Sequence, residues 1–586
     1  MCGVFCIYTK KPLNDDCMSL ANNMMTSLEH RGPDGNGIWC NKDEGILLGH
    51  TRLSIIDLSS GSDQPMQRDG TIISYNGEVY NYKEIRLELE SLGYVFTSIG
   101  DTEVVLYAWQ EWGDLAFEKF DGMFVIAIFD GEVLTISSDR FGEKTLYYAI
   151  TENAIYISSE LSTLVKELSL PPNNSKEIDT LFMLYGYIPG PKTYYKNTYK
   201  LQPAEVIKIK SGSILSKHTY WTLPSYKKTH GIVKRPSKND LSIIRNALIE
   251  SLEMRLHADV PMCLFLSGGV DSALVASILK FELNKNIDCV TVAFKGNDSL
   301  DESSQALEVS NFLGLSHEIV NVDSSHHTDI VKEVINMFGQ PFETTTSLIV
   351  RDMTAAVSDK YKVGLTGFGA DEVFSGYGKH AYAYKYRKFL NANNFFRFLV
   401  KYIARYLILD RGGRLSNWSH SMLGVDFNER YFAIKLFPTI RELRKLPEYW
   451  NIVNSTFFSY KDIVRLVYKF ELMNALPDSR CVSNDLGSMN SSFELRTPFL
   501  SKKIVEATNK IDYRKFVAFG QKEILRSLLK EYLPDSLVDR PKRGFSIPNE
   551  WVLSGVKKNS KYNGSGDNWD KLKVRSEILR RYHCDV

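Results

Sequence analysis

A glycine-rich turn between two apolar segments carries the clearest chemical signal in the chain. Residues 261–272 read PMCLFLSGGVDS, so an apolar run ends abruptly in small residues, and the spacing of Leu274, Ile278 and Phe281 then predicts a helix. A strand, a glycine turn and a helix in this order bring unpaired N–H groups and the positive end of a helix dipole to one point. We therefore predict that this turn binds phosphate.

Asp271 indicates which phosphate chemistry the turn supports. A carboxylate beside polyphosphate would repel it unless a cation lay between them, so we predict that Asp271 binds Mg²⁺. No lysine follows the glycines as in a Walker A loop, which argues against simple γ-phosphate transfer. An ordinary tight turn is the alternative. The stretch Ser267–Ser272 resembles the pyrophosphate loop of the ATP pyrophosphatases, which split ATP into AMP and pyrophosphate while adenylating an acceptor.

Cys2 is a candidate nucleophile, because a small second residue allows removal of the initiator Met. Its α-amino group, with an ordinary pKa of about 7.7–8.0, could then act as the base for its own thiol. A small buried side chain is the alternative for a lone cysteine. Four further segments favour catalysis: a turn cluster at 30–35, a strand at 49–55 that carries Arg52, a strand at 72–78 that enters an Asn76-Gly77 turn, and a helix that begins at 100–103.

Together with Cys2, these segments resemble the glutaminase domain of the class II, N-terminal-nucleophile amidotransferases. The resemblance implies that Arg52 and Asp101 hold the amino acid end of glutamine, and that Asn76 and Gly77 form the oxyanion hole. A guanidinium can bind an α-carboxylate and a carboxylate can pair with an ammonium, so the residue types suit these roles. The resemblance implies further glutamine contacts from Leu53, Ile55 and Glu78.

Alternating strands and helices follow the phosphate turn, with strands predicted at 290–294 and 363–366. Such alternation predicts a parallel sheet whose ligand lies across the carboxyl ends of the strands. Asp371 then faces the same cleft as Asp271 and is a second candidate for binding Mg²⁺, with a helix N-cap as the alternative. By the resemblance, ATP and pyrophosphate contact residues spread over these segments: Leu266, Ser267, Gly268, Gly269, Asp271, Ser272, Val292, Phe294, Thr366, Gly367, Asp371 and Lys522.

The length of 586 residues predicts at least two domains. The many apolar strands of the first part predict a two-sheet α+β sandwich covered by helices, and the polar, proline-containing stretch at 227–238 suits a linker. We predict a glutaminase domain at 1–215, a linker at 216–239 and a doubly wound parallel-sheet domain at 240–586, an α/β fold in which Asp240 caps the first helix.

The net charge of +1 gives no electrostatic argument for binding nucleic acid or a membrane surface, and no apolar run approaches the length of a membrane span. The eight cysteines are scattered without paired metal spacing, which is typical of reduced thiols and predicts a cytoplasmic location. Small molecules are the expected partners, and a homodimer is left open.

In their order, the two sets of motifs resemble the glutamine-hydrolysing asparagine synthetase family over nearly the whole chain. The resemblance implies that Cys2 releases ammonia from glutamine, while the second domain uses ATP and Mg²⁺ to adenylate a carboxylate that ammonia converts into an amide. A dry passage must join the two sites, because ammonia that escaped to water would be protonated and lost as a nucleophile.

Three departures from the family fall in the second half. The family usually places an acidic residue, thought to take a proton as ammonia attacks, where this chain has Phe368. It commonly shows Lys and Arg around the positions of Ser483 and Leu486, and Asp-Glu-Pro where this chain has Gly-Gln-Pro at 339–341.

Three hypotheses remain open about the reaction of the second half. The chain makes asparagine from aspartate, or it amidates another carboxylate such as a nucleotide-linked uronic acid in surface-polysaccharide synthesis, or it joins a glutaminase to a nucleotide- or partner-binding domain that completes no synthesis. Asp271 and Ser272 argue against the third hypothesis, and Phe368 argues against the first.

Overall fold

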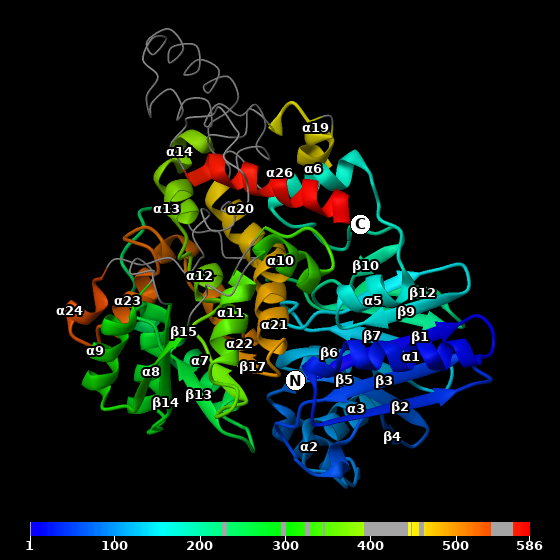
Figure 1. Ribbon diagram of the computed structural model, residues 1–586. Helices are drawn as coiled ribbons and strands as arrows, with labels where there is room; N and C mark the ends of the chain where they lie inside the picture. The colour runs from blue at the N-terminus through cyan, green and yellow to red at the C-terminus, as the bar shows by residue number, and fades with distance from the viewer. Residues whose placement is uncertain are drawn as a thin grey trace.

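In the part of the chain that the structure describes, three β-sheets organise the fold, two in the N-terminal half and one in the C-terminal half (Figure 1). The computed structural model describes residues 2–224, 231–294, 301–322, 329–343, 346–391, 443–446, 448–455, 462–540 and 567–585. The first half is an antiparallel sandwich and the second a parallel α/β sheet, which confirms the predicted fold class. No helix in these ranges has the length and apolar character needed to cross a membrane.

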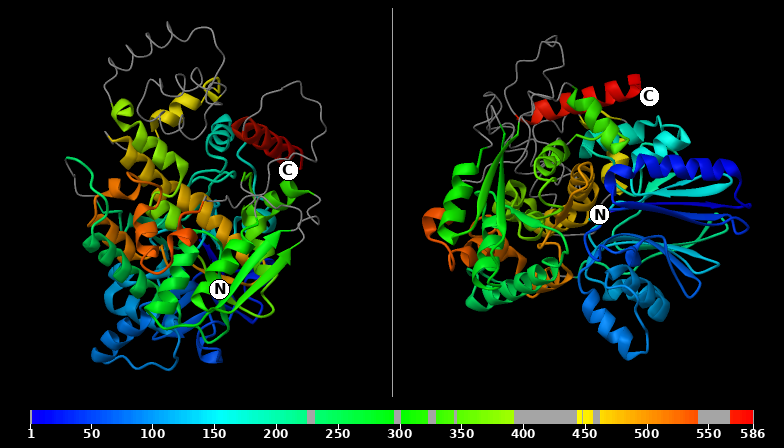
Figure 2. Two further views of the ribbon diagram at one scale, coloured as in Figure 1. Left: turned by 90° about the vertical axis from the view of Figure 1, so that its left-hand side faces the viewer. Right: turned by 60° about the horizontal axis from the view of Figure 1, so that its bottom comes forward.

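The two sheets of the sandwich face each other (Figure 2) and each has six strands. In spatial order, the first contains β10 (Thr198–Lys200), β8 (Tyr147–Ile150), β9 (Ala154–Ser158), β1 (Gly3–Thr9), β3 (Ile46–Arg52) and β2 (Gly35–Asn41). The second contains β12 (Ser213–Thr219), β11 (Glu205–Lys210), β7 (Leu134–Ser138), β6 (Gly122–Phe129), β5 (Thr71–Val79) and β4 (Met66–Arg68). The main helices of this half are α1 (Asp15–Ser27), α2 (Tyr82–Ser91), α3 (Asp101–Trp112), α4 (Ala116–Lys119), α5 (Leu161–Leu168) and α6 (Lys176–Tyr185).

Strand β6 shows why this half is layered. All of its residues are buried, as expected for a strand with one face against a second sheet and the other against helices. Val125 and Phe129 pack in the core between the sheets, whereas Phe124 and Ile128 pack in the core that contains α2 and α3. The continuous apolar run in the sequence therefore marks a central strand.

Five parallel strands form the C-terminal sheet. In spatial order they are β15 (His317–Val322), β14 (Asp288–Phe294), β13 (Met262–Phe265), β16 (Val363–Leu365) and β17 (Glu494–Arg496). The chain moves outward from β13 to β14 and β15, then crosses to the other side of β13 for β16 and β17. In open α/β sheets, ligands bind at the carboxyl ends of strands where the winding reverses, here between β13 and β16.

The helices of this half surround the sheet and reach back to the sandwich. The main ones are α7 (Lys238–Arg255), α8 (Val270–Phe281), α9 (Ser303–Leu313), α10 (Ile330–Phe338), α11 (Thr346–Ala355), α12 (Ala370–Val373), α13 (Gly378–Lys385), α20 (Ile463–Phe470), a π-helix (Glu471–Cys481), α21 (Val482–Met489), α22 (Lys502–Asn509), α23 (Glu523–Leu529) and α26 (Asp567–Asp585). Helix α26 lies beside α6 of the sandwich (Figure 1), and Arg575 donates to the backbone oxygen of Met183 at 2.5 Å. Because β12 ends at Thr219, the first residues of the predicted 216–239 linker belong to this strand.

Two local predictions are wrong. Asn76 and Gly77 form no turn, because they lie inside β5 and pair with β6. The preference of Asn-Gly for turns is local, and pairing with a buried neighbouring strand overrides it. Asp240 does not cap α7: the cap is Ser237, and Asp240 completes a capping box by accepting the Ser237 backbone N–H at 2.7 Å.

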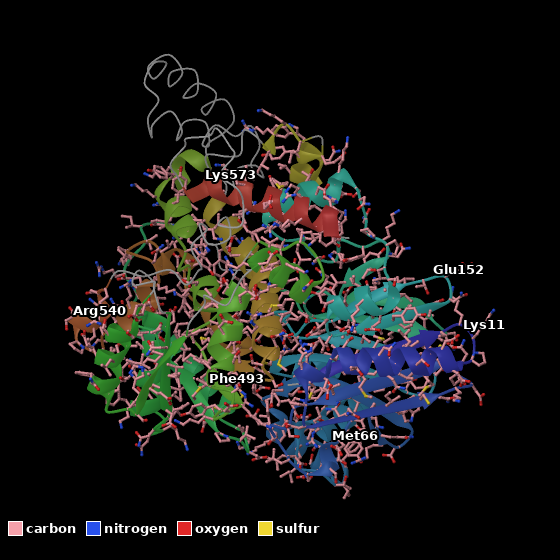
Figure 3. The ribbon with its side chains drawn as sticks, viewed as in Figure 1. Lys11, Met66, Glu152, Phe493, Arg540 and Lys573 are labelled. Carbon is pink, nitrogen blue, oxygen red and sulfur yellow. The ribbon has the colours of Figure 1, made fainter. Side chains whose placement is uncertain are left out.

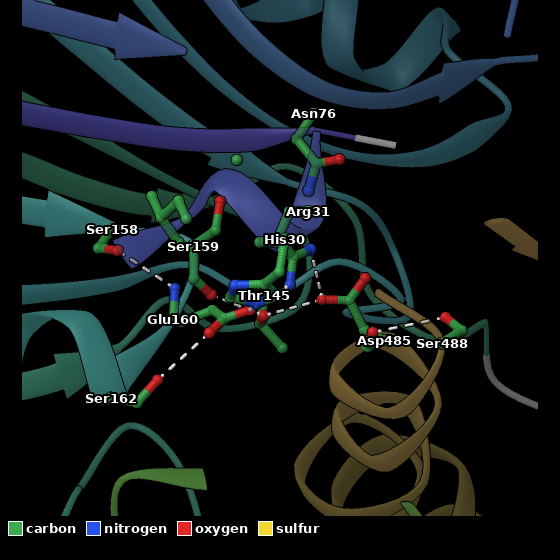
Figure 4. Close-up of polar contacts among 12 residues, drawn as sticks. His30, Arg31, Asn76, Thr145, Ser158, Ser159, Glu160, Ser162, Asp485 and Ser488 are labelled. Atoms are coloured by element: carbon green, nitrogen blue, oxygen red, sulfur yellow. Dashed lines mark hydrogen bonds and ion pairs between the residues drawn. The ribbon is translucent and has the colours of Figure 1, made fainter. Parts of the chain in front are cut away.

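A buried arginine joins the two halves. Arg31, at the end of the short 3-10 helix Glu29–Arg31, is fully buried. Its guanidinium donates to Glu160 Oε1 and to Asp485 Oδ2, each at 2.9 Å, and to the backbone oxygen of Cys2 at 3.1 Å. Asp485 extends from α21 toward Arg31 (Figure 4). A residue near the N terminus is thus neutralised by a helix of the C-terminal half.

Asp485 also binds a second cation from the sandwich. Lys144 Nζ lies 3.3 Å from Asp485 Oδ1, and Thr145 Oγ1 donates to Asp485 Oδ2 at 3.2 Å. Burial alone would raise the pKa of Asp485, but Arg31 and Lys144 lower it below its ordinary value. The carboxylate therefore stays ionised between two cations. Side chains fill the surrounding boundary between the halves, near the labelled Phe493 that precedes β17 (Figure 3).

Replacing Asp485 by alanine should weaken the contact between the halves, because Arg31 and Lys144 would stay buried without their shared counter-charge. We expect the free energy of unfolding, measured in urea, to fall by about 3–5 kcal/mol. Lys362 and Asp34 form a second pair between the halves at 2.8 Å, but Lys362 is 37% exposed. As the control, Lys362→Ala should cost less than about 1 kcal/mol. Equal losses in the two variants would contradict the role given to Asp485.

Candidate functional site

Cys2 directly precedes β1, where the N terminus meets the C-terminal half (Figures 1 and 2). Its backbone nitrogen donates to Asn76 Oδ1 at 2.9 Å. Removal of Met1 would turn this nitrogen into the α-amino group and keep it beside the thiol. Burial raises the pKa of the Cys2 thiol, while the Leu53 backbone N–H and the charge of Arg52 act in the opposite direction. The thiol therefore needs a base, and the α-amino group would be the nearest one in its own residue.

One pocket gathers the residues predicted to hold glutamine. Those in its wall are Cys2, Arg52, Leu53, Ile55, Gly77, Glu78 and Asp101. Asn76 adjoins it through the hydrogen bond to Cys2. These residues come from the start of β1, the end of β3, the middle of β5 and the start of α3, which the sandwich brings to one edge. The wall also contains residues that the sequence did not indicate: Ile56, Ser62, Gln64, Tyr75, Thr102 and, from the C-terminal half, Glu494.

Asn76 and Gly77 have the features that an oxyanion hole requires. Asn76 Nδ2 is buried and has no hydrogen-bond partner among the described residues. A buried donor left unpaired beside a thiol is suited to the negative charge that develops on an attacked carbonyl oxygen. Gly77 has φ of 150°, and a Cβ at this position would lie 2.1 Å from the backbone oxygen of Met123, so no side chain fits there.

Arg52 and Asp101 lie in the same wall with different surroundings. Arg52 Nη1 donates to the backbone oxygen of Ser59 at 2.9 Å and to Asp63 Oδ1 at 2.6 Å, which hold the guanidinium in place. Asp101 Oδ2 accepts from the Tyr75 hydroxyl at 2.7 Å and from the Val79 backbone N–H at 2.9 Å. Burial raises the pKa of Asp101 to about 6 in spite of these bonds. Arg52 and Asp101 therefore offer a cationic group and a titratable anionic group to the two charged groups of an amino acid.

The phosphate turn is built as the sequence indicated, with β13 before it and α8 beginning at Val270. The Ser267 backbone N–H donates to Ser272 Oγ at 3.0 Å, and the two hydroxyl oxygens lie 2.9 Å apart. A Cβ on Gly268 would lie 2.5 Å from the Cβ of Gln305, so glycine is required by close packing. The turn and the first turn of α8 together form an anion-binding N-terminus.

The other predicted nucleotide residues lie at the same edge of the sheet. They are placed by three strands: Leu266 follows β13, Val292 and Phe294 lie on β14, and Thr366 follows β16. The side chain of Phe294 lies outside the described residues. A Cβ on Gly367 would lie 2.7 Å from the Cβ of Asp271, so the segments after β13 and β16 are in close contact. Both segments flank the point where the winding of the sheet reverses.

Lys522 brings together the two residues predicted to bind Mg²⁺. Its Nζ pairs with Asp271 and, at 2.7 Å, with Asp371 Oδ1. Burial alone would lower the pKa of Lys522, but the two carboxylates raise it above its ordinary value. Two carboxylates that converge on one cation fit Mg²⁺, which takes one or two carboxylates together with phosphate oxygens. No cluster of three or more His, Cys, Asp or Glu suited to a metal occurs within the described ranges.

A narrow cavity lies where the halves meet, and Phe368 forms part of its wall. The remaining wall residues come from both halves: Met123, Glu143, Lys144, Cys481, Asn484, Asp485, Ser488, Leu495 and Thr497. The cavity has room for about one molecule of the size of water. Met123 pairs with Glu78 across β5 and β6, and Glu78 lines the Cys2 pocket. The cavity is therefore next to the Cys2 pocket on one side and reaches Phe368, two residues after Thr366, on the other.

The remaining departures from the family bring no charge to this region. Ser483 Oγ donates along its own helix to the backbone oxygen of Ser479 at 2.7 Å, and Leu486 packs in the hydrophobic core. Gln340 Oε1 accepts from the Tyr194 backbone N–H at 3.0 Å, which ties the segment after α10 to the sandwich.

Two protein-family models match the chain. Residues 1–221 match a glutamine amidotransferase domain and residues 243–562 match asparagine synthase. The chain belongs to the asparagine synthase family. Glutamine-hydrolysing asparagine synthetase 1 of Bacillus subtilis (strain 168) is 28% identical over 584 residues, which cover 94% of this chain and 89% of that protein. The amidase chry2 of Gibberella zeae is 27% identical over 412 residues, which cover 64% of this chain and 59% of that protein.

This member of the asparagine synthase family is a glutamine amidotransferase of the asparagine synthase type, and its second domain implies the use of ATP. Relatives at similar identity include a named asparagine synthetase and a named amidase. Family membership therefore leaves the acceptor open.

Glu494 is a candidate residue that sequence reasoning missed. It begins β17 of the asparagine synthase domain, yet it lines the Cys2 pocket of the other half. Arg496 Nε lies 2.7 Å from Glu494 Oε1, and Arg496 Nη2 lies 3.2 Å from Glu78 Oε1. One buried arginine thus joins two acidic residues of the pocket wall. No residue beside Glu494 in the sequence indicates this position, because Glu494 reaches the pocket only through the packing of the two halves.

Glutamine should bind less tightly to a Cys2→Ala variant as the pH falls through about 6, because a protonated Asp101 cannot pair with the ammonium of glutamine. The Asp101 carboxylate is ionised above this pKa and neutral below it. The dissociation constant, measured by calorimetry, should rise about tenfold between pH 7 and pH 5. In the same background, Asp101→Asn should bind weakly at every pH. A constant affinity of the Cys2→Ala variant over this range would contradict the assignment.

Proposed function

We propose that this protein is an ATP-dependent amide ligase that takes its nitrogen from glutamine and, as the first candidate, converts aspartate into asparagine. Glutamine is hydrolysed in the Cys2 pocket, and the acceptor carboxylate is adenylated at the turn Ser267–Ser272. Ammonia passes between the two sites. The cavity between the Cys2 pocket and Phe368 is the single observation that carries the proposal, because it is lined by both halves and matches ammonia in size.

The glutaminase step follows from the groups around Cys2. The α-amino group takes the thiol proton, and Sγ attacks the amide carbon of glutamine. The oxyanion receives hydrogen bonds from Asn76 Nδ2 and the Gly77 backbone N–H. The α-ammonium returns the thiol proton to the departing nitrogen, so ammonia leaves as the C–N bond breaks and a thioester remains. Water then hydrolyses the thioester, which releases glutamate and restores the thiol. Arg52 binds the α-carboxylate of glutamine and Asp101 its ammonium, which sets the amide against Sγ.

The adenylation step uses the edge of the parallel sheet. The N–H groups of the turn and of α8 bind the phosphates of ATP, and an oxygen of the acceptor carboxylate attacks the α-phosphorus while pyrophosphate leaves. Asp271 and Asp371 would hold Mg²⁺, which screens the charge of the phosphates when bound. Lys522, placed between these carboxylates, donates to the departing pyrophosphate.

One observation favours an acceptor other than aspartate. Phe368 and Leu486 are apolar where the family usually has polar side chains. Apolar side chains in the cleft suit a bulkier acid, such as the uronic acid of a nucleotide sugar, better than the small and densely charged aspartate. The turn Ser267–Ser272 is intact, and Lys522 and Asp371 meet beside it. This arrangement supports synthesis over a domain that only binds nucleotide.

Cys2→Ala and Asp271→Ala should separate the two sites. Without Cys2, glutamine-dependent amidation should be lost while ammonium-dependent amidation remains, because only the nitrogen source is removed. Without Asp271, acceptor-dependent pyrophosphate release should fall by at least about 100-fold, a typical loss for a group that stabilises transferring phosphate. Glutamine hydrolysis should remain measurable in this second variant. The two-site proposal would be contradicted if Cys2→Ala also lost ammonium-dependent amidation, or if Asp271→Ala also lost glutamine hydrolysis.

Pyrophosphate release from ATP and Mg²⁺ in the presence of ammonium tests the acceptor directly. The assay compares L-aspartate with UDP-glucuronate, and mass spectrometry identifies the amide product. Turnover of aspartate supports asparagine synthesis with Phe368 in place. Turnover of UDP-glucuronate but not of aspartate would mean that the acceptor is the bulkier acid. The assay is then repeated with a panel of other carboxylates. If no acid, including these two, supports pyrophosphate release, the proposal is contradicted.

A further inference from the structure

The cavity between the two sites contains several groups that could exchange a proton with ammonia. Attack of ammonia on an acyl-adenylate leaves a positive charge on nitrogen, and the amide forms only when a base removes one of its protons. Phe368, in the cavity wall, has no group that can accept it. The titratable residues in the wall are Glu143, Lys144, Cys481 and Asp485.

Three of these four residues are unsuited to the task. Lys144 and Asp485 are paired with each other at 3.3 Å, and Asp485 also accepts from Arg31 at 2.9 Å. Arg31 and Lys144 lower the pKa of Asp485, which therefore holds a proton poorly. Burial raises the pKa of the Cys481 thiol well above its ordinary value, so it stays protonated and cannot act as a base.

Glu143 differs from the others in having an available oxygen. The residue is 7% exposed, and Oε2 accepts a hydrogen bond from Thr497 Oγ1. Oε1 is buried and has no hydrogen-bond partner among the described residues. An acceptor buried without a partner is costly, which is a feature of sites that bind a ligand donor. Ammonia carries N–H donors and fits the cavity.

We propose that Glu143 is the acid-base residue of amide formation, and that its Oε1 accepts the proton released when ammonia attacks the acyl-adenylate. This inference rests on the proposed function. In the step, the nitrogen lone pair forms the C–N bond, the bond from carbon to the adenylate oxygen breaks, and AMP leaves with that electron pair. One N–H bond breaks, its proton moves to Glu143 Oε1, and it passes to solvent when the products leave.

The surroundings of Glu143 adjust its proton affinity to this task. Burial raises the pKa of Glu143 to about 8, and Asp139 acts in the same direction. Arg255 of α7 and Lys144 oppose the rise, and the Thr497 hydroxyl favours the ionised form. The other titratable groups around it are Tyr80, which follows β5, Cys481 of the π-helix and Asp485 of α21. A base whose pKa lies near the working pH both takes and returns a proton readily.

Glu143→Gln tests the proposal, because it keeps the shape of the side chain and removes its basicity. The assay uses glutamine, ATP, Mg²⁺ and the acid that the unaltered protein adenylates, and it records glutamate, pyrophosphate and amide together. We expect glutamate and pyrophosphate at their normal rates, with amide formed per pyrophosphate reduced by about 100-fold. In the unaltered protein, the amide formed per pyrophosphate should increase as the pH is raised through about 8, because Glu143 then becomes ionised. In the variant this ratio should not increase.

Two further variants distinguish proton transfer from a structural role. Phe368→Glu, added to Glu143→Gln, restores a carboxylate to the same cavity and should recover about a tenth or more of the amide yield. Glu132→Gln, on an exposed turn where Glu132 is 68% exposed, is the matched control and should change nothing.

Four outcomes would overturn the proposal. The first two concern Glu143→Gln: a normal amide yield, or an equal fall of glutamate, pyrophosphate and amide. The third is a dependence of amide yield on pH that is the same in this variant as in the unaltered protein. The fourth is no recovery of amide when Phe368→Glu is added. Absence of pyrophosphate release by the unaltered protein with every acid would instead refute the proposed function itself, so the two failures can be told apart.

Discussion

The neutralisation of Arg31 is the interaction on which the rest of the structure depends. A fully buried guanidinium costs several kcal/mol unless its charge is paired and its N–H groups are bonded. Arg31 meets this requirement with Glu160 from the sandwich, Asp485 from α21 and the backbone oxygen of Cys2. Docking of the two halves and placement of the candidate nucleophile are therefore parts of one event. The Cys2 site is complete only when the C-terminal half supplies its carboxylate.

Two pairs of neighbouring residues set the Cys2 pocket and the cavity close together. Glu78 faces the Cys2 pocket and its partner Met123 faces the cavity. Consecutive residues of β17 repeat the arrangement, because Glu494 lines the pocket and Leu495 lines the cavity. Neighbouring residues thus line both spaces, so the proposed path for ammonia between them is short. A short route through packed side chains also keeps out water, which would protonate ammonia.

Much of this arrangement could be predicted from the sequence, because its signals are local. The phosphate turn depends on neighbouring residues, and Cys2, Arg52 and Asp101 carry side chains whose chemistry identifies them. Local signals also failed: Asn76 and Gly77 favour a turn, but pairing with β6 holds them in a strand. Residues whose role arises from docking had no signal at all. Glu143 meets Thr497 across 354 positions of the chain, and Glu494 reaches a pocket of the other half.

One short segment connects docking with the chemistry of the cavity. Asp139 accepts the backbone N–H groups of Glu143 and Lys144, at 3.0 and 3.1 Å, and so fixes the turn between β7 and β8. From this turn Lys144 reaches Asp485, while Glu143 reaches Thr497 after β17. The residue that binds the halves together and the residue proposed to take the proton are adjacent in the chain. The acid-base group can therefore occupy the cavity only when the halves are joined, which is also the only state in which ammonia has an enclosed route to follow.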